Sequence, residues 1–525
     1  MKISTKIIWL GTIMPMIFLA LFIQGSSPLK TPLEKSQFRK LTQHGPMMDY
    51  LKELSSGSKE ISLEIIGKSV QGREIPALFI TKNSKFGSKR AEKPVVMVFC
   101  QQHGNEPSGK EAALIVARDL VKKQSNILKN IDLILIPMVN PDGAELLQRR
   151  NANNMDLNRN HVLLSEPEVQ ALHKVYKKWM PDVTLDIHEY NSISRRWVET
   201  GMVKDADEML GGATNLNIDP ELIAFSRNVL MPQIGTLIKE RGFSYSRYIV
   251  GGPPSEHTRV RHSTTNINDG RHSFGIYNNL SFIIEGKRFP DPSQNIEYRT
   301  KGQIAALLSF LETMSQNHRE IIELVSEAQK ELLLEGSEVE HLSYIQMDYF
   351  PDSLNPTFRF PVFDLYKWKH TEVDLERYEP LVKIKRSITK PVAYIFSSGE
   401  KELIDLIGRH EIEMCSLKED SQLNVELYRI RHVTDGIDEE KANKEIDVYK
   451  WTESRLIEAG SILVLLDQNA SKLIPLLLEP LSSYGVVAER SMLQYCFNQY
   501  LEEGREYPIV RLPGSISMDL VILLK

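Results

Sequence analysis

Short apolar runs alternate with amphipathic helical stretches between residues 61 and 314, and this alternation constrains the fold more strongly than any other feature of the sequence. The apolar runs predict strands at residues 61–66, 75–80, 95–100, 133–139, 183–188 and 280–284. The amphipathic stretches predict helices at residues 108–122, 165–179, 220–240 and 298–314. Such alternation is typical of a parallel or mixed sheet that helices cover. We therefore expect an α/β fold, a mixed β-sheet flanked by helices on both faces. At the second helix, Ser165-Glu166-Pro167-Glu168 predicts a capping box with proline in the first turn.

The length of 525 residues exceeds what one ordinary core holds, which predicts two domains. We expect a larger catalytic domain at residues 31–335 and a connecting segment, rich in proline, aromatic and charged residues, at residues 336–390. Residues 391–525 carry further strand and helix patterns and predict a smaller C-terminal α/β domain. Its Asp and His residues are scattered without metal-ligand spacing, so its role stays open.

The N-terminus resembles an export signal. Lys2 and Lys6 precede an uncharged apolar run at residues 7–23, and small residues follow it. This order is typical of a secretory signal, although the run is long for a cleaved signal and short for a spanning helix. Residues 1–30 are therefore expected to be a signal peptide or an N-terminal membrane anchor. The rest of the chain is expected outside the cytoplasm, periplasmic or extracellular, free or anchored to the membrane by residues 7–23.

Charge and cysteine content exclude two other classes. The net charge of −5 gives no electrostatic footprint for nucleic acid, so no nucleic-acid partner is expected. Three cysteines are too few for a disulfide framework. Cys100 is interpreted as a packing residue, and Cys415 and Cys496 could pair, although nothing in the sequence requires it. The oligomeric state is left open.

Three candidate metal ligands follow predicted strands. His103 and Glu106 lie three residues apart on a strand-to-helix turn, and His188 ends the strand at residues 183–188. The carboxyl ends of strands in open α/β sheets meet at one edge, where ligands bind. Zinc hydrolases use three protein ligands and keep a fourth position open for water. The sequence therefore predicts one zinc ion per chain, bound by these three residues.

Arginine and asparagine gather between these ligands. Arg149 and Arg150 precede the run Asp156-Leu157-Asn158-Arg159-Asn160. Arginine binds a carboxylate in bidentate geometry, and a neighbouring asparagine adds a further hydrogen bond. A carboxylate clamp beside a zinc site is what an enzyme that cuts at the end of a peptide chain requires.

The motifs, in this order, resemble the zinc carboxypeptidase family, the M14 metallocarboxypeptidases, over roughly residues 35–320. The matching pieces are His103-Gly104-Asn105-Glu106, Asn140-Pro141-Asp142-Gly143, Asp156-Leu157-Asn158-Arg159-Asn160, His188 and Ile283-Ile284-Glu285. The resemblance implies a zinc-dependent hydrolase that cleaves the peptide bond next to a free C-terminal carboxylate. A zinc-held water would attack the bond, with Glu285 as general base.

The resemblance also implies the roles of the other site residues. Asn158 and Arg159 would hold the terminal carboxylate of the substrate. Arg149, favoured over Arg150 by its spacing to Asp156, would polarise the scissile carbonyl and stabilise the oxyanion. Asp156 would accept a hydrogen bond from the far nitrogen of the first histidine ligand and orient it.

One departure from the family concerns a substrate-contacting tyrosine, which usually lies some twenty residues before the catalytic glutamate. That spacing leads to residues 261–264, where no tyrosine stands, and Tyr245, Tyr248 and Tyr277 do not fit it cleanly. Asp269 and Arg271 fall where the family shapes the pocket for the terminal side chain. Asp269 could select a basic residue and Arg271 an acidic or diaminopimelate-like group, or both could belong to ion-paired structure.

Two other functions remain as alternatives. A related deacylase would remove an acyl group from a small amino acid, and the test is whether lengthening the peptide, or blocking its free carboxylate, abolishes turnover. A non-catalytic relative would keep the site without turnover. In that setting, Glu285 could pair with Lys287 or Arg288.

Overall fold

The computed structural model describes residues 29–524, except residues 83–84, 124–125, 254–258, 338–340, 439–440 and 489–496. Residues 1–28, the main part of the expected signal or anchor, lie outside this range, as does Cys496. Within the described residues, no helix is both long and apolar enough to cross a membrane.

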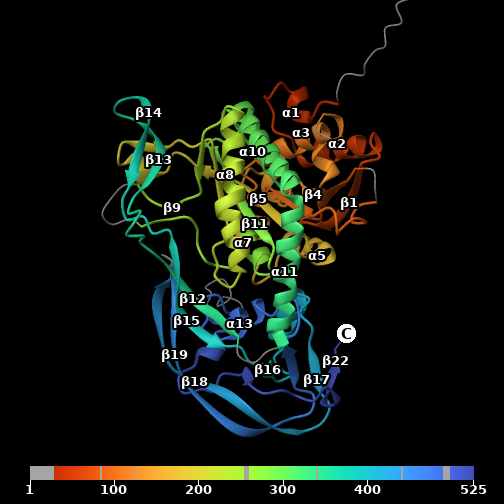
Figure 1. The fold of residues 1–525 in the computed structure, drawn as a ribbon, viewed down its shortest axis with the longest axis vertical. Helices are drawn as coiled ribbons and strands as arrows, with labels where there is room; N and C mark the ends of the chain where they lie inside the picture. The colour runs from red at the N-terminus through yellow and green to blue at the C-terminus, as the bar shows by residue number, and fades with distance from the viewer. Residues whose placement is uncertain are drawn as a thin grey trace, which may run out of the picture.

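An eight-stranded sheet forms the centre of the larger domain (Figure 1). Its order is β1 (Ile61–Lys68), β2 (Glu74–Ile80), β4 (Asp132–Ile136), β3 (Val95–Cys100), β5 (Val183–Asn191), β11 (Leu280–Arg288), β7 (Glu208–Gly212) and β8 (Tyr245–Arg247). The middle strands β4, β3, β5 and β11 are parallel to one another. The pairs β1–β2, β2–β4 and β11–β7 are antiparallel. The expected mixed sheet is thus confirmed.

Helices cover both faces of the sheet because the side chains of each strand alternate between two apolar layers. In β3, Val96 and Val98 belong to one layer, and Met97 and Phe99 belong to the other. The first layer contains residues of α2 (His44–Ser56), α3 (Ser108–Lys122), α8 (Met231–Glu240) and α10 (Ile296–Gln316). The second layer contains residues of α5 (Pro167–Trp179) and α9 (Gly270–Gly275).

Two predicted helix details differ in the structure. Helix α5 begins at Pro167 with Glu166 as its N-cap and without a side-chain cap, so the predicted capping box is wrong. The Glu168 carboxylate instead accepts hydrogen bonds from the Val70 backbone and the Asn151 side chain. The helix expected at residues 220–240 is divided into α7 (Pro220–Phe225), a π-helical turn at Ser226–Leu230, and α8.

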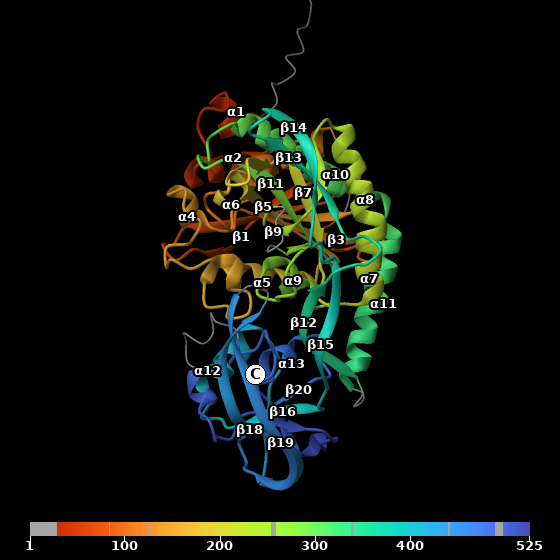
Figure 2. The ribbon, with the colours of Figure 1, turned by 90° about the vertical axis from the view of Figure 1, so that its left-hand side faces the viewer.

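The segment expected to connect the domains contains two β-hairpins. Strand β12 (Leu342–Phe350) pairs with β15 (Leu381–Thr389). Strand β13 (Phe358–Asp364) pairs with β14 (Lys369–Leu375) and also with β6 (Met202–Lys204) of the larger domain. Helix α11 (His318–Ser337) precedes these hairpins. The hairpins run along the side of the molecule that faces the viewer in Figure 2.

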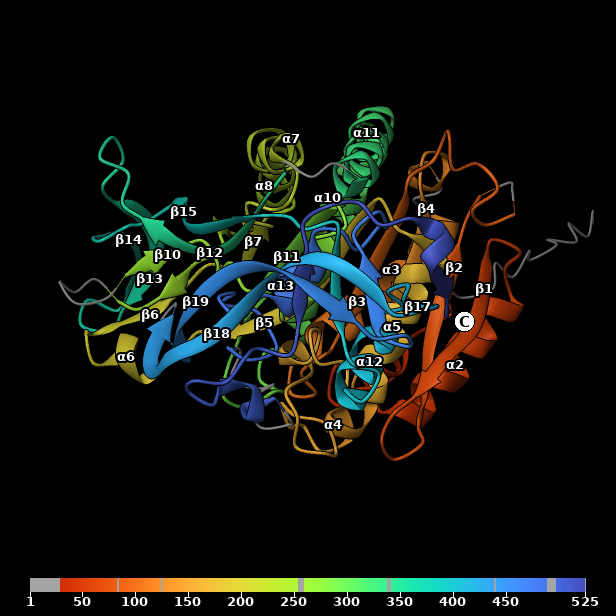
Figure 3. The ribbon, with the colours of Figure 1, turned by 90° about the horizontal axis from the view of Figure 1, so that it is seen from below.

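The C-terminal part is a second, antiparallel sheet of seven strands (Figure 3). Its order is β19 (Lys441–Ile457), β18 (Ser421–Asp438), β21 (Val510–Leu512), β16 (Ala393–Phe396), β20 (Ile462–Leu465), β17 (Cys415–Leu417) and β22 (Val521–Leu523). Helices α12 (Lys401–Arg409) and α13 (Leu473–Leu478) accompany it. The sheet shares an apolar core with the α5 face of the larger domain. The ring of His410 also hydrogen bonds to the Val162 carbonyl, 2.6 Å away, just after the Asp156–Asn160 run.

Candidate metal and active site

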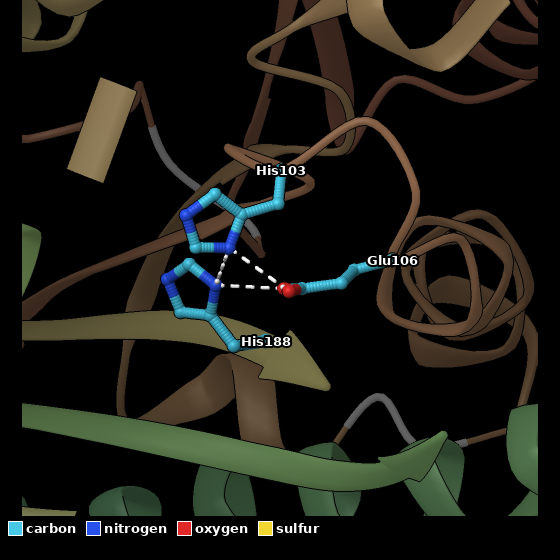
Figure 4. Close-up of side chains that lie close together, drawn as sticks. All are labelled: His103, Glu106 and His188. Carbon is cyan, nitrogen blue, oxygen red and sulfur yellow. Dashed lines mark hydrogen bonds and ion pairs between the residues drawn. The ribbon is translucent and has the colours of Figure 1, made fainter. Parts of the chain in front are cut away.

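The three predicted metal ligands meet at the carboxyl ends of β3 and β5 (Figure 4). The Nδ1 atoms of His103 and His188 lie 3.1 Å apart. The carboxylate of Glu106 is 2.9 Å from each of these nitrogens, through a different oxygen to each. All three side chains are buried. Their sequence positions explain this meeting, because β3 and β5 are adjacent parallel strands that end at the same edge.

The geometry and chemistry of these donors fit a zinc ion. Donors about 2.0–2.1 Å from a tetrahedral ion are separated by roughly 3.3 Å, which is close to the separations observed here. Although burial raises it, the imidazoles of His103 and His188 hold the pKa of Glu106 well below its usual range. The carboxylate is therefore ionised at neutral pH, as a metal ligand must be. Two histidines and a glutamate are also the ligand set of a known class of catalytic zinc sites.

Carboxylates on the far side of each imidazole orient both histidine ligands. The Nε2 atom of His103 is 3.1 Å from Asp156 Oδ1, and the Nε2 atom of His188 is 2.9 Å from Asp186 Oδ2. Each carboxylate favours a proton on Nε2 and so leaves the Nδ1 lone pair for the ion. Asp156, the orienting residue that the resemblance implies, thus contacts the far nitrogen of His103. Asp186 was not predicted, although residues i and i+2 of a strand share a face, which was the available signal.

The structure brings Arg149 to the site and turns Arg150 away. The Nε atom of Arg149 lies 3.1 Å from Asp156 Oδ2, and its Nη1 atom lies 3.6 Å from Glu106 Oε1. Arg150 instead donates to the Asn154 carbonyl at 2.8 Å, in an exposed turn. Of the two arginines that the sequence left as candidates, Arg149 therefore faces the metal ligands.

Glu285 lies beside His188, because these two residues are register partners in the parallel strands β11 and β5. Burial raises the pKa of Glu285 to about 7, while the nearby charge of His188 opposes this rise. The alternative pairing with Lys287 or Arg288 is not formed. Lys287 pairs with Asp205 at 2.5 Å, and Arg288 donates to a backbone carbonyl.

Asn158 and Arg159 follow Asp156 on a short 3-10 turn, Leu157–Arg159. The Asn158 amide oxygen accepts a hydrogen bond from the Gly270 backbone at 2.7 Å, and its nitrogen lies 3.1 Å from His188 Nε2. The Arg159 guanidinium donates to the Asn158 carbonyl and is partly exposed. Both residues thus lie at the edge of the metal site.

Two further residues near Glu285 were not predicted. Tyr248 follows β8, and burial and the charge of Glu285 raise its pKa, which Arg271 and Arg159 oppose. Its ring centre lies 5.6 Å from the Arg271 guanidinium, a contact that the spacing along the chain does not reveal. Lys204 of β6 holds its ammonium 4.4 Å from the centre of the Tyr190 ring. Burial lowers the pKa of Lys204 to about 8, and Glu285 opposes this shift.

Asp269 has a structural role. It is the N-cap of α9, where its carboxylate accepts from the His272 backbone at 2.7 Å. The Arg271 guanidinium lies 3.6 Å from the same carboxylate and stacks 5.6 Å from the centre of the Tyr248 ring. Asp269 therefore belongs to ion-paired structure, which is one of the two alternatives given above.

Comparison with the sequences of known proteins finds carboxypeptidases. The family model described as zinc carboxypeptidase matches residues 47–164. Carboxypeptidase 2 of Trichophyton tonsurans is 24% identical over 470 residues, which cover 85% of this chain and 81% of that protein. Carboxypeptidase SOL1 of Arabidopsis thaliana is 34% identical over 153 residues, 26% of this chain and 29% of that protein.

Solved metallocarboxypeptidases are also similar to part of the chain. The enzyme from Burkholderia cenocepacia covers 53% of this chain and 71% of its own length, with 17% identity and a TM-score of 0.41. The enzyme from Pseudomonas aeruginosa covers 52% and 68%, with 22% identity and a TM-score of 0.39.

The matched family region contains the first two metal ligands and the Asp156–Arg159 run, and the fold adds His188 beside them. The relative from Trichophyton tonsurans extends the similarity over most of both chains. Residues 47–164 of this chain thus match the zinc carboxypeptidase family, and the remaining site residues lie beside this matched region in the fold.

Proposed function

We propose that this protein is a zinc-dependent carboxypeptidase that cleaves the peptide bond next to a free C-terminal carboxylate, with Glu285 as its general base. The observation that carries the proposal is the convergence of His103, Glu106 and His188 beside Glu285. Digestion of a mixed peptide library, read by mass spectrometry with and without chelator, tests it. Loss of single C-terminal residues only without chelator is the expected result, and an undigested library would contradict it.

Bound zinc would supply a Lewis acid that polarises the scissile carbonyl and acidifies a water molecule. Glu285 takes the proton from the attacking water and delivers it to the leaving amine. Its raised pKa suits both transfers, because a group with a pKa near the working pH is efficient as a base and as an acid.

Arg149 would stabilise negative charge on the carbonyl oxygen. Its guanidinium contacts Asp156 through Nε and Nη2, at 3.1 and 3.0 Å, and this pairing fixes its direction beside Glu106. A preorganised donor of this kind stabilises the oxyanion, and the effect grows once bound substrate displaces water from the partly exposed guanidinium.

Asn158 and Arg159 would hold the terminal carboxylate of the peptide. With Nδ1 on the metal, the remaining proton of His188 lies on Nε2 and is donated to Asp186. This Nε2 atom of His188 cannot then accept a hydrogen bond from the Asn158 amide group. The amide hydrogens of Asn158 therefore remain available for an acceptor on the substrate. The substrate carboxylate is such an acceptor, and Arg159 supplies the charge.

The clamp gives the first prediction. Arg159→Gln is expected to weaken binding of peptides with a free C-terminus about 10- to 100-fold, the range for a lost charge-assisted hydrogen bond. The effect on KM should exceed the effect on kcat. Steady-state kinetics on one peptide measure this, with Arg150→Gln, whose side chain faces away, as the control.

The same measurement separates the competing functions. A deacylase would turn over small N-acyl amino acids and lose activity as the peptide is lengthened, and a non-catalytic relative would bind zinc without turnover. Amidation of the peptide C-terminus should abolish cleavage by a carboxypeptidase. Equal cleavage of the free and amidated peptides would contradict the proposed function.

We also propose that the protein is exported, with peptides outside the cytoplasm as its substrates. The basic start and the apolar run at residues 7–23 support this. Fusion of residues 1–30 to a reporter enzyme that is active only after export is expected to give activity. Replacing Lys2 and Lys6 with glutamate should reduce it, and an inactive parent fusion would contradict export.

A further inference from the structure

A cavity of about 160 Å³ lies at the edge of the central sheet, bounded by β7, the π-helical turn before α8, the end of β8, and residues 380–382. Gly211 and Gly212 form its floor. A Cβ atom at Gly212 would come within 2.5 Å of Ser226 Oγ, and one at Gly211 within 2.9 Å of Arg271 Nη1. A side chain at either position would therefore clash with its neighbours, and at Gly212 these neighbours, Ser226 and Met231, line the cavity.

Two arginines line this cavity without an acidic partner. Among the described residues, neither Arg227 nor Arg247 forms an ion pair with an aspartate or glutamate. Burial lowers the pKa of Arg247, and the positive charge of Arg227 adds to this. Arg227 is exposed, but Arg247 is partly buried, and partly buried arginines are usually paired because an uncompensated charge away from water is unfavourable. An anion that contacts both guanidiniums would relieve the desolvation of Arg247 and the repulsion between the two charges.

The local backbone gives an independent indication. Arg227 lies on the π-helical turn Ser226–Leu230, which interrupts the helix between α7 and α8. Such turns are rare, cost stability and occur frequently at functional sites. Here the turn places Ser226 and Arg227 on the wall of the cavity that Arg247 also lines.

The cavity is next to the catalytic centre. Its floor residue Gly211 is the register partner of Ile283, two residues before Glu285. Its wall residue Tyr248 has a phenol that the charges of Glu285 and Arg159 both influence. A peptide held by its carboxylate at Arg159, with its last bond at Glu285, would direct its terminal side chain toward this wall.

We propose that the cavity lined by Arg227 and Arg247 binds a carboxylate group, namely the acidic side chain of the C-terminal residue that the enzyme removes. The assignment of this carboxylate to a peptide substrate rests on the proposed carboxypeptidase function. The binding of a carboxylate in the cavity does not. A volume several times the roughly 30 Å³ of one water molecule accommodates a short acidic side chain, and not a folded segment. The guanidiniums bind a carboxylate more strongly than the neutral amide of the same shape.

Two peptides that differ only in a terminal glutamate or glutamine test the origin of the carboxylate. The wild-type protein is expected to favour glutamate about 10- to 100-fold in kcat/KM, and Arg247→Gln or Arg227→Gln should bring the ratio close to one. Arg195→Gln, an exposed arginine outside the cavity, should leave the ratio unchanged.

Calorimetric titration of zinc-free protein with glutarate tests binding without catalysis. The wild-type protein should bind glutarate at least about tenfold more tightly than either cavity variant. Arg247→Lys keeps the charge without the planar fork and should retain part of the affinity. Thermal unfolding shows whether each variant is folded. Because Arg227→Gln changes an exposed side chain, this variant still tests the inference if an Arg247 variant does not fold.

The two experiments separate the outcomes. Glutarate binding that needs both arginines, without a preference for terminal glutamate, would support the carboxylate site and show that its ligand is a free dicarboxylate. Equal glutarate affinity in the wild type and both variants, with equal peptide ratios, would overturn the inference. A protein that cleaves no peptide would remove the proposed function, while the titration would still decide whether the cavity binds a carboxylate.

Discussion

Replacing Glu285 with glutamine is expected to lower kcat/KM about 10²- to 10⁴-fold while zinc remains bound. The amide has nearly the same shape as the carboxylate but cannot accept the proton of the attacking water. Since Glu285 is not one of the three converging donors, the metal site itself should be unaffected. The loss should appear mainly in kcat, because the clamp for the terminal carboxylate is intact.

Glu208→Gln is a matched control for this variant. Glu208 is a buried glutamate on the neighbouring strand β7, one residue from the register partner of Glu285. Burial raises the pKa of Glu208 well above its usual range, so its carboxyl group is already neutral and an amide is a small change. Zinc content by metal analysis and peptide kinetics should therefore match the wild type. Full activity in Glu285→Gln would contradict the assigned base.

The strands that carry the metal site could be predicted because each is a short apolar run buried on both faces. The run at residues 95–100 became β3 with the expected bounds. Strands β7 and β8 were missed, since Glu208–Gly212 ends in two glycines and Tyr245–Arg247 is short and polar. The long hairpin β18–β19 was missed as well, because its polar sequence resembles that of a surface loop. Tertiary pairing, and not local pattern, makes these segments strands.

The residues of the site likewise divide into those that the sequence reveals and those that only the fold reveals. Its metal ligands could be predicted from motifs that lie at strand ends, and Asp156 from its place in the Asp-x-Asn-Arg run. Tyr248 and Lys204 carry no local signal, because their approach to Glu285 depends on how β8 and β6 pack against the sheet edge. The cavity between Arg227 and Arg247 depends on a π-helical turn that periodicity alone could not reveal.

Removing the metal is expected to abolish peptide cleavage, and one equivalent of zinc per chain should restore it. The three donors converge on one point, and the buried Glu106 carboxylate is ionised, so the site is built around a cation. Because zinc binds the folded state and not the unfolded chain, it should also raise the unfolding temperature. At a concentration 1,000 times Kd, the stabilisation is about 4 kcal/mol.

Two variants divide this prediction between the metal ligands and their orienting partners. His188→Ala should lose zinc and activity together. Asp156→Asn should keep the site but bind zinc about 10- to 100-fold more weakly, since His103 is the one metal ligand whose orienting partner it changes. His432→Ala, at an exposed histidine of the C-terminal sheet, is the control. Competition with a zinc-sensitive dye measures the affinities. Cleavage that resists the chelator would contradict the metal site, and so would an unchanged zinc affinity in His188→Ala. A reaction that depends on this cation cannot proceed once a ligand that holds it is gone.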